Sequence, residues 1–419
     1  MGKRVALLPS WYWPENVERH LGTPTVFLDE YLVGRNVRRF GDSIALVSNT
    51  RWTYSELDRR ISAVAAEVSG RLDNDGSSVA VVASEDPCMT VAMLLGGLRT
   101  RQMVGLLDTS LSPEKAERVL TRLRPRIVVG TTPPQWPRTT IPTIAGSDLL
   151  TMEPGALRRG NLGNRSPALL LPSSTEYLAQ HSHHSVLSAV IAMAAFFRVP
   201  EATVHLSALP VLTWSGLVAA FLPLYVRGTS VLTVDHDPHR LAELVIAHRP
   251  LSVWLPPDWA WKLAEDAPRA LISAIRQYVS WIVVPVEEPY PVGQRKRLRK
   301  TFRTPVLPLY GLPETGPAAG THPDWYYLDA AVGIPVTNAD LRPVDYESLD
   351  WVVIPWDMIR EAQIAVKGPQ VMLGYDQPDA TDHYLKEKWY LTNAIARMDA
   401  NGMFYLNQMR KEWFSYGVP

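Results

Sequence analysis

The first 130 residues alternate between segments with helical periodicity and short apolar runs. After Thr53, apolar residues recur at steps of three and four positions up to Val68, which predicts an amphipathic helix. In the segment 78–83 (SVAVVA), the residues after Ser78 form an unbroken apolar run, which is typical of a strand covered on both faces. Two further strands are predicted at 103–107 and 126–129, each after a helical segment. Such β-α-β alternation predicts a parallel sheet with helices on its faces.

The alternation is interrupted at 131–165, which is rich in Pro, Thr, Gly and Arg, and it resumes at Pro167. Strands are then predicted at 168–171, 230–234, 252–255 and 281–284, and helices at 183–199, 217–225, 241–248, 270–278 and 292–302. After about Gly320 the pattern changes to short strands with turns, predicted at 351–354, 363–366 and 403–406. We therefore expect an α/β fold with two αβ-layered subdomains, 1–165 and 166–320, and a small β-rich subdomain, 321–419.

Composition and charge narrow the classes of function. Hydrophobic residues make up 46% of the chain and charged residues 20%, which fits a globular protein with a large core. Lys and Arg together number 42, as do Asp and Glu, so no net field favours nucleic acid or an anionic membrane surface. The longest apolar segments, 186–197 and 217–226, are shorter than the roughly 18 residues that span a bilayer. We expect a cytoplasmic protein with no nucleic-acid or membrane partner.

Several short motifs occur in a fixed order along the chain. They are WTYSELD at 52–58, YGLPETG at 310–316, GPQVMLGY at 368–375, WYLT at 389–392 and RMDANG at 397–402. In this order they resemble the adenylate-forming superfamily, which contains acyl-CoA synthetases, nonribosomal peptide synthetase adenylation domains and luciferase. The resemblance covers about 27–417 and implies the large N-terminal core of that fold. It also implies that the sequence ends just past the hinge position, about Glu412, without the mobile C-terminal domain that carries the catalytic Lys.

The resemblance implies an activity in which a carboxylate attacks the α-phosphate of ATP and the acyl group then passes to a thiol. The family's phosphate cradle reads T-S-G-T-T-G-x-P-K-G, in which glycines let backbone N–H groups approach the phosphates. Residues 172–180 read PSSTEYLAQ instead, without Gly or Lys. Glu176 lies in the phosphate region, where a carboxylate repels a polyphosphate. We therefore expect no cofactor, and binding of ATP and magnesium is doubtful.

Other positions of the family's nucleotide site are changed as well. Val286 and Glu287 replace the two glycines against which the adenine would lie. Pro313 removes a Thr hydroxyl, and Ala394 replaces the ribose-binding Asp. Met409 stands in place of the Arg before the hinge. These changes predict that ATP-dependent adenylation has been lost.

Two residues are candidates for retained catalytic chemistry. Glu314 matches the family's magnesium ligand, and His183 lies in the run His181-Ser-His-His184, which aligns with a family H-T-H motif. His183 and Glu314 could flank the old reaction centre, with the histidine as a general base. The alternative is an inherited helix start with satisfied imidazoles. No metal site is predicted, because no fixed spacing of carboxylates supports one.

The resemblance also implies a substrate pocket. Its candidate residues are Thr213, Trp214, Gly216, Tyr310, Gly311, Leu312 and Thr315. Thr213 occupies the position of the Asp that anchors the amino group in amino-acid-activating members, so an acyl or aryl group, free or on an acyl carrier protein, fits better than an amino acid. The basic segment 295–300 is either a solvated helix face or a patch for the carrier protein.

Three hypotheses for function stay open, and whether the chain is an enzyme is uncertain. The first is a degenerate acyl-CoA synthetase-like protein that binds an acyl or carrier-linked intermediate in a biosynthetic pathway and could transfer it without ATP. The second is an AMP-forming acyl ligase completed by a separate protein. The third is a non-catalytic scaffold. An open pocket around Trp214, Tyr310 and Glu314 would favour the first, whereas a filled pocket around Val286 would favour the third.

Overall fold

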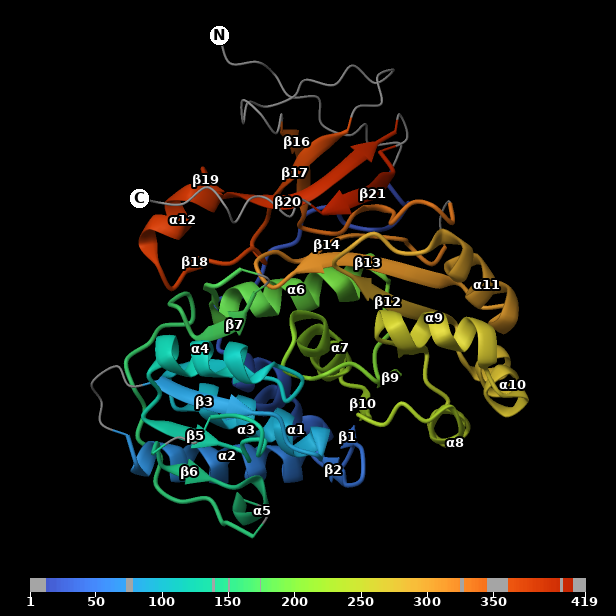
Figure 1. The fold of residues 1–419 in the computed structure, drawn as a ribbon. Helices are drawn as coiled ribbons and strands as arrows, with labels where there is room; N and C mark the ends of the chain where they lie inside the picture. The colour runs from blue at the N-terminus through green and yellow to red at the C-terminus, as the bar shows by residue number, and fades with distance from the viewer. Residues whose placement is uncertain are drawn as a thin grey trace.

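Two large sheets and one small sheet organise the chain, with helices between and outside them (Figure 1). The structure is a computed structural model. It describes residues 13–72, 78–137, 140–149, 151–173, 175–324, 328–344, 361–399 and 402–409. The predicted strand at 351–354 and the hinge position near Glu412 lie outside these residues.

The first sheet has the order β18-β8-β7-β4-β3-β5-β6. Its strands are β3 (Ser78–Val82), β4 (Met103–Leu107), β5 (Ile127–Val129), β6 (Thr143–Ile144), β7 (Leu169–Pro172), β8 (Leu178–His181) and β18 (Gly374–Tyr375). Its helices are α2 (Tyr54–Gly70), α3 (Pro87–Arg99), α4 (Pro113–Leu123) and α5 (Gly146–Leu149). Every residue of β3 is buried, because Val79 and Val81 face the core that holds α3 while Ala80 and Val82 face α4. The expected two-sided strand is thus present.

The second sheet has nine strands in the order β15-β14-β13-β12-β11-β9-β10-β1-β2. They are β1 (Ile44–Val47), β2 (Arg51–Thr53), β9 (Val204–Ser207), β10 (Thr229–Leu232), β11 (Ser252–Trp254), β12 (Trp281–Val286), β13 (Val306–Leu312), β14 (Gly316–Gly320) and β15 (Ile334–Pro335). The outer helices are α8 (Pro238–His248), α9 (Pro257–Asp266), α10 (Arg269–Tyr278) and α11 (Val292–Phe302). Strands β9 to β13 pair in parallel, as the alternation predicted.

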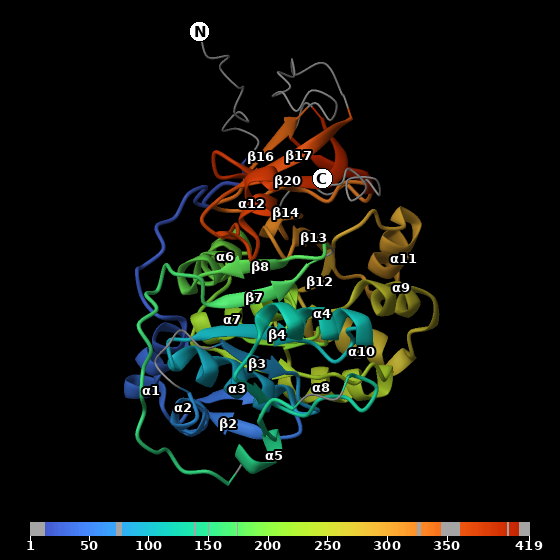
Figure 2. The same ribbon diagram turned by 60° about the vertical axis from the view of Figure 1, so that its left-hand side comes forward.

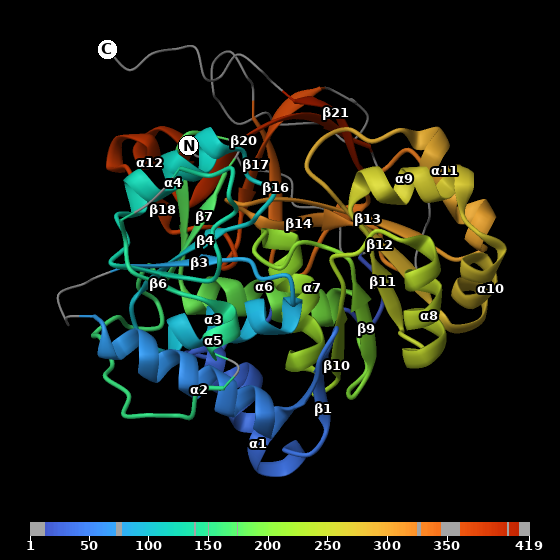
Figure 3. The ribbon, with the colours of Figure 1, turned by 60° about the horizontal axis from the view of Figure 1, so that its bottom comes forward.

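Helices α6 (His183–Phe196) and α7 (Trp214–Tyr225) lie between the two large sheets (Figure 3). They share one hydrophobic core with Leu169 of the first sheet and with Val283 and Leu309 of the second. A short π-helix (Glu30–Gly34) continues into α1 (Arg35–Phe40) and packs beside the end of α7. Helices α6 and α7 therefore connect the site described below with the opposite side of the molecule.

The small sheet sits over one end of the large sheets (Figure 2). It contains β16 (Asp340–Val344), β17 (Ala362–Lys367), β19 (Leu385–Lys386), β20 (Trp389–Met398) and β21 (Phe404–Met409), with α12 (Pro378–Tyr384) beside it. All its pairings are antiparallel. The β-rich character expected after Gly320 is confirmed.

Strands cross both of the subdomain boundaries expected from the sequence. β1 and β2 come from 1–165 but belong to the second sheet, whereas β7 and β8 come from 166–320 but belong to the first. β18, from the last segment, pairs with β8. In the parts of the chain that the structure covers, no helix combines the length and the apolar character needed to cross a bilayer.

Candidate functional site

Glu314 lies in the tight turn between β13 and β14, where the family motif places a magnesium ligand. Its side chain is fully buried, and its Oε1 accepts a hydrogen bond of 2.8 Å from the hydroxyl of Tyr375. The Tyr375 hydroxyl in turn lies 2.9 Å from that of Tyr390. Glu314 Oε2 and the hydroxyl of Tyr310 have no hydrogen-bond partner among the described residues. The carboxyl group is thus enclosed by tyrosines.

Burial disfavours the ionised form of this carboxyl group. It raises the pKa of Glu314, and the Tyr375 hydroxyl only partly opposes the shift. A magnesium ion is usually bound through one or two ionised carboxylates together with phosphates and several waters. Among the described residues, no group of three or more His, Cys, Asp and Glu side chains could hold a metal ion. The surroundings of Glu314 therefore do not fit a magnesium site.

The segment at the position of the phosphate cradle is a closed hairpin turn between β7 and β8. The Ser173 and Thr175 hydroxyls lie 2.6 Å apart. The N–H of Thr175 donates to Ser173 Oγ, and the N–H of Tyr177 donates to Thr175 Oγ1, both at 3.0 Å. A phosphate cradle needs backbone N–H groups directed at the ligand. Here two of them are satisfied inside the turn, and Glu176 is exposed beside them, so the turn does not fit a polyphosphate.

At the position of the adenine floor, Val286 ends β12 as a buried core residue and Glu287 follows it. Glu287 is exposed as a residue, but its carboxyl group turns inward and accepts a hydrogen bond of 2.6 Å from Trp214 Nε1. Enclosure of this carboxyl group by protein raises the pKa of Glu287 to about 7, with a further contribution from nearby Glu314.

Trp214 is the first residue of α7 and fills the region where the resemblance implies an acyl pocket. It is 4% exposed and packs on Gly311, where a Cβ atom would lie 2.7 Å from Trp214 Cη2. Thr213 caps α7, because its Oγ1 accepts from the N–H of Gly216 at 3.1 Å. A Cβ atom on Gly216 would lie 1.7 Å from Pro210 O, so this position requires glycine. Thr213 and Gly216 thus shape the start of the helix.

The space left beside Trp214 is small. This Trp214 cavity measures about 20 Å³ and is lined by His181, Trp214, Leu217, Val218, Pro313 and Gly316. A cavity of this size holds about one water molecule. An acyl or aryl group cannot enter it unless Trp214 moves.

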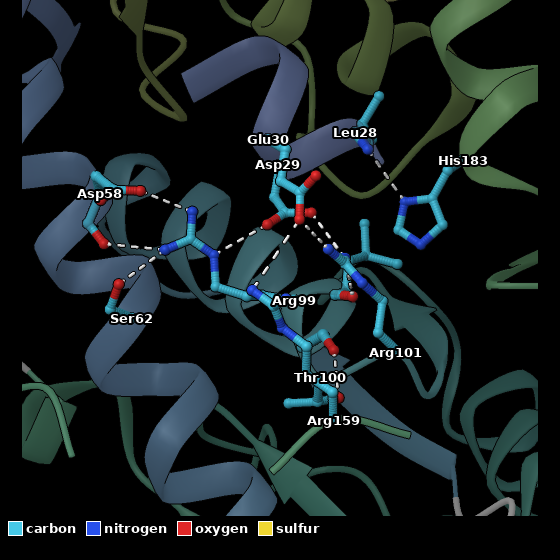
Figure 4. Close-up of polar contacts among 12 residues, drawn as sticks. Leu28, Asp29, Glu30, Asp58, Ser62, Arg99, Thr100, Arg101, Arg159 and His183 are labelled. Carbon is cyan, nitrogen blue, oxygen red and sulfur yellow. Dashed lines mark hydrogen bonds and ion pairs between the residues drawn. The ribbon is translucent and has the colours of Figure 1, made fainter. Parts of the chain in front are cut away.

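His183 and Glu314 are not brought together by the fold. His183 Nδ1 accepts a hydrogen bond of 3.3 Å from the N–H of Leu28 (Figure 4). The His183 ring also meets the Phe27 ring edge-on. Burial lowers the pKa of His183 to about 4. His181 is the histidine next to Glu314, because its Nε2 lies 2.6 Å from Pro313 O. His181 ends β8 and His183 begins α6, so the two rings of one motif contact different parts of the molecule.

The other candidate substrate residues are interior residues. Tyr310 is fully buried, and its ring centroid lies 5.2 Å from that of Phe404 in the small sheet. The N–H of Leu312 donates to Thr315 Oγ1 at 3.0 Å, which closes the turn that carries Glu314. These three residues hold the turn in place and present no open surface.

A buried ion cluster next to His183 was not expected from the sequence. Asp29 accepts hydrogen bonds of 2.9 Å from both Arg99 and Arg101 (Figure 4). Arg99 also contacts Asp58 at 2.7 Å. Burial would raise the pKa of Asp29, but the two guanidinium groups hold it below its ordinary value. The cluster joins the segment before α1 to α2 and α3. Of its members, Asp58 ends the WTYSELD motif, but the spacing of the members along the chain does not signal the cluster.

The basic helix α11 is only partly a surface feature. Arg295 is fully buried and donates to the carbonyl oxygens of Ala331 at 2.6 Å and Leu328 at 2.9 Å. The interpretation of Arg295 as part of a solvated or carrier-binding face is therefore wrong, because this side chain connects α11 to the segment before β15. Lys296, Arg297 and Lys300 are exposed.

Comparison with known proteins agrees with this architecture. Residues 178–376 match the family model described as AMP-binding enzyme. A long-chain-fatty-acid–CoA ligase of Salmonella typhimurium is 39% identical over 109 residues, which are 26% of this chain and 18% of that protein. A 2-succinylbenzoate–CoA ligase of a Geobacillus strain is 32% identical over 111 residues, 26% of this chain and 21% of that protein.

Solved structures of the same fold cover nearly the whole chain. ATP-bound MatB from Rhodopseudomonas palustris superposes with a TM-score of 0.77 at 20% identity, over 90% of this chain and 78% of that one. The o-succinylbenzoate coenzyme A synthetase MenE of Bacillus subtilis, in complex with ATP and magnesium, gives 0.78 at 17% identity, over 93% and 81%. The family match and the shared fold lead to one conclusion: residues 178–376 match the AMP-binding enzyme family, and the chain has the fold of the N-terminal core of the adenylate-forming superfamily.

Proposed function

We propose that this acyl-CoA ligase-like protein does not catalyse ATP-dependent adenylation and acts as a non-catalytic member of its family. The observation that carries the proposal is the enclosure of Glu314. The one retained nucleotide-site carboxylate is fully buried, hydrogen-bonded to Tyr375, and has a raised pKa. Burial disfavours the ionised form of this carboxyl group, and a carboxyl group enclosed by tyrosines is a poor ligand for a hard divalent cation.

Two further features support the proposal independently. The turn at the cradle position satisfies N–H groups of Thr175 and Tyr177 with its own hydroxyls, so they are not free for a phosphate. Trp214 occupies the region of the acyl pocket and leaves about 20 Å³. The protein would have to rearrange at the cradle position to bind a nucleotide, and at Trp214 to bind an acyl group.

Calorimetric titration with ATP and magnesium tests the nucleotide half of the proposal. We expect no saturable heat for the wild-type protein at ATP concentrations that saturate a ligase with an intact cradle, used as the positive control. Saturable binding that Glu314→Gln abolishes would contradict the proposal, because it would mean that Glu314 becomes exposed and ionised in the presence of nucleotide.

A second candidate function is binding of an acyl or aryl group, delivered as a carrier-protein thioester and transferred without ATP. It is favoured by the way in which the cavity is closed: Trp214 meets Glu287 through one hydrogen bond, while Leu217 and Val218 provide an apolar lining. An outward rotation of the indole would open this lining to a ligand. In such a transfer the thioester C–S bond breaks, the acyl group moves to a nucleophile and the carrier thiol is released.

Incubation with acyl-loaded carrier protein, followed by intact-mass detection of carrier and protein, separates the two functions. The main proposal predicts that the carrier keeps its acyl group at the rate of spontaneous hydrolysis. Loss of the acyl group that is faster than spontaneous hydrolysis, and faster still in Trp214→Ala because this substitution opens the cavity, would establish the second function instead.

A further inference from the structure

A second and much larger hollow lies at the other end of α6 and α7. Its volume is about 740 Å³, within the range of about 300–1,000 Å³ that is usual for small-molecule sites. The Trp214 cavity is lined by residues near the start of both helices, whereas this hollow is lined by Ala194 and Ala195 of α6 and by Tyr225 at the end of α7. His183 and Ala195 are separated by about 18 Å along the helix axis, so the hollow is distinct from the site around Glu314.

Arginines dominate the polar part of this hollow, which we name the arginine pocket. Arg35, Arg38, Arg39 and Arg227 line it, together with a single acidic residue, Glu201. Arg227 forms an ion pair with Glu201. Arg38 and Arg39 are exposed on α1 and have no carboxylate partner among the described residues. The lining therefore presents at least two guanidinium groups whose charge is not neutralised by protein.

Arg35 is held in place by aromatic and backbone contacts. Its guanidinium lies 3.9 Å from the ring centroid of Tyr31 and 5.3 Å from that of Tyr225, and it donates to Tyr225 O. Its Nε is buried and has no hydrogen-bond partner among the described residues.

The remaining wall of the arginine pocket is apolar. Ile191, Ala194 and Val226 are buried, and Ala195 and Val199 are half-buried beside them. An apolar wall beside unpaired guanidinium groups is complementary to a molecule with an anionic head and an apolar body. The planar guanidinium group binds carboxylate and phosphate through paired hydrogen bonds.

We propose that the arginine pocket is a binding site for an amphipathic anion, a carboxylate or phosphate head on an aliphatic or aryl body. The head contacts Arg38 and Arg39 at the rim, and the body lies against the ends of α6 and α7. This site does not depend on the proposed loss of adenylation, because it shares no lining residue with the Trp214 cavity.

Calorimetry on the full chain with octanoate and octyl phosphate as anionic probes, octanol as the uncharged probe and acetate as the head alone tests this site. We expect both anionic probes to bind, and octanol and acetate to bind at least about tenfold more weakly, because each lacks one of the two contacts. Equal affinity for octanoate and octanol would overturn the proposal, as would failure of both anionic probes to bind.

Variants locate the binding. Arg38→Gln with Arg39→Gln should lower the affinity for octanoate about tenfold, and Ala195→Phe should lower it by filling the apolar wall. The control pair Lys115→Gln with Arg118→Gln removes two exposed charges from α4 and should leave the affinity unchanged. An equal loss of affinity in the control pair would mean a general charge effect and would overturn the proposal.

A vesicle experiment distinguishes this site from a membrane-binding surface. If the protein floats with anionic vesicles but binds none of the monomeric probes, the arginines belong to a membrane surface and the proposal is overturned.

Discussion

At the scale of single residues, the side chains around Glu314 and Trp214 contact one another. Glu314 accepts from Tyr375, Trp214 donates to Glu287, and His181 contacts Pro313 O. The sequence identified Glu314 and Trp214 as important but could not predict that they are enclosed. Enclosure depends on Tyr375, which is 61 positions from Glu314 in the chain.

The first prediction concerns Trp214. Trp214→Ala removes a buried indole that packs on Gly311, so we expect it to lower the free energy of unfolding by about 3–5 kcal/mol. Urea denaturation monitored by circular dichroism measures this. Trp261→Ala is the matched control, because Trp261 is only half-buried and stacks on Tyr290, and it should cost less. If Trp214→Ala lowered the free energy of unfolding by less than Trp261→Ala does, Trp214 would not be packed against Gly311 as described.

The second prediction concerns the pH dependence at Glu287. Its pKa is raised from 4.5 to about 7 in the folded protein, so the native state holds this proton more tightly than the unfolded chain does. The stability that Glu287 contributes is therefore fully present below pH 4.5 and is lost as the pH rises through about 7.

Glu287→Gln should thus make stability fall less steeply between pH 4.5 and 7 while keeping an oxygen acceptor for Trp214. The measurement is the midpoint of urea unfolding at several pH values, with Glu288→Gln at the exposed neighbour as the control. An unchanged slope in Glu287→Gln would show that this carboxyl group is solvated.

At the scale of elements, local pattern predicted most helices and strands but not all their contacts. The helix after Thr53 is present as α2, and Thr53 and Glu56 form a capping box at its start. Helix α6 ends at Phe196 and not at Val199, and the helix α9 (Pro257–Asp266) was not predicted. The ion cluster of Asp29 joins three elements, and periodicity within one element contains no information about such a junction.

The third prediction belongs to that junction. Asp29→Asn leaves Arg99 and Arg101 buried without their shared carboxylate, so we expect a loss of about 3–5 kcal/mol in the free energy of unfolding. Glu30→Gln is the control, because Glu30 contacts Arg101 from a side chain that is half exposed, and it should cost no more than about 1 kcal/mol. Thermal and urea unfolding both report the difference. Equal effects of the two substitutions would mean that the cluster does not contribute as a buried unit.

At the scale of the whole molecule, the fold class was predictable and the partition into sheets was not. The order of motifs indicated the adenylate-forming core, and the α/β architecture with a small β-rich part is confirmed. β1 and β2 join the second sheet although they precede the first in sequence, and β18 returns to pair with β8. The hydrophobic pattern of a strand predicts that the strand is buried, but it does not predict which other strand it pairs with.

The proposed absence of ATP-dependent adenylation is tested most directly by exchange of labelled pyrophosphate into ATP across a panel of carboxylic acids. The reaction reports the first half-reaction alone and needs only nucleotide, magnesium and acid. We predict exchange no greater than that of a sample without protein for every acid, while a ligase with an intact cradle exchanges under the same conditions. Acid-dependent exchange that is abolished in Glu314→Gln would contradict the account, because it would show that this carboxylate still serves a nucleotide.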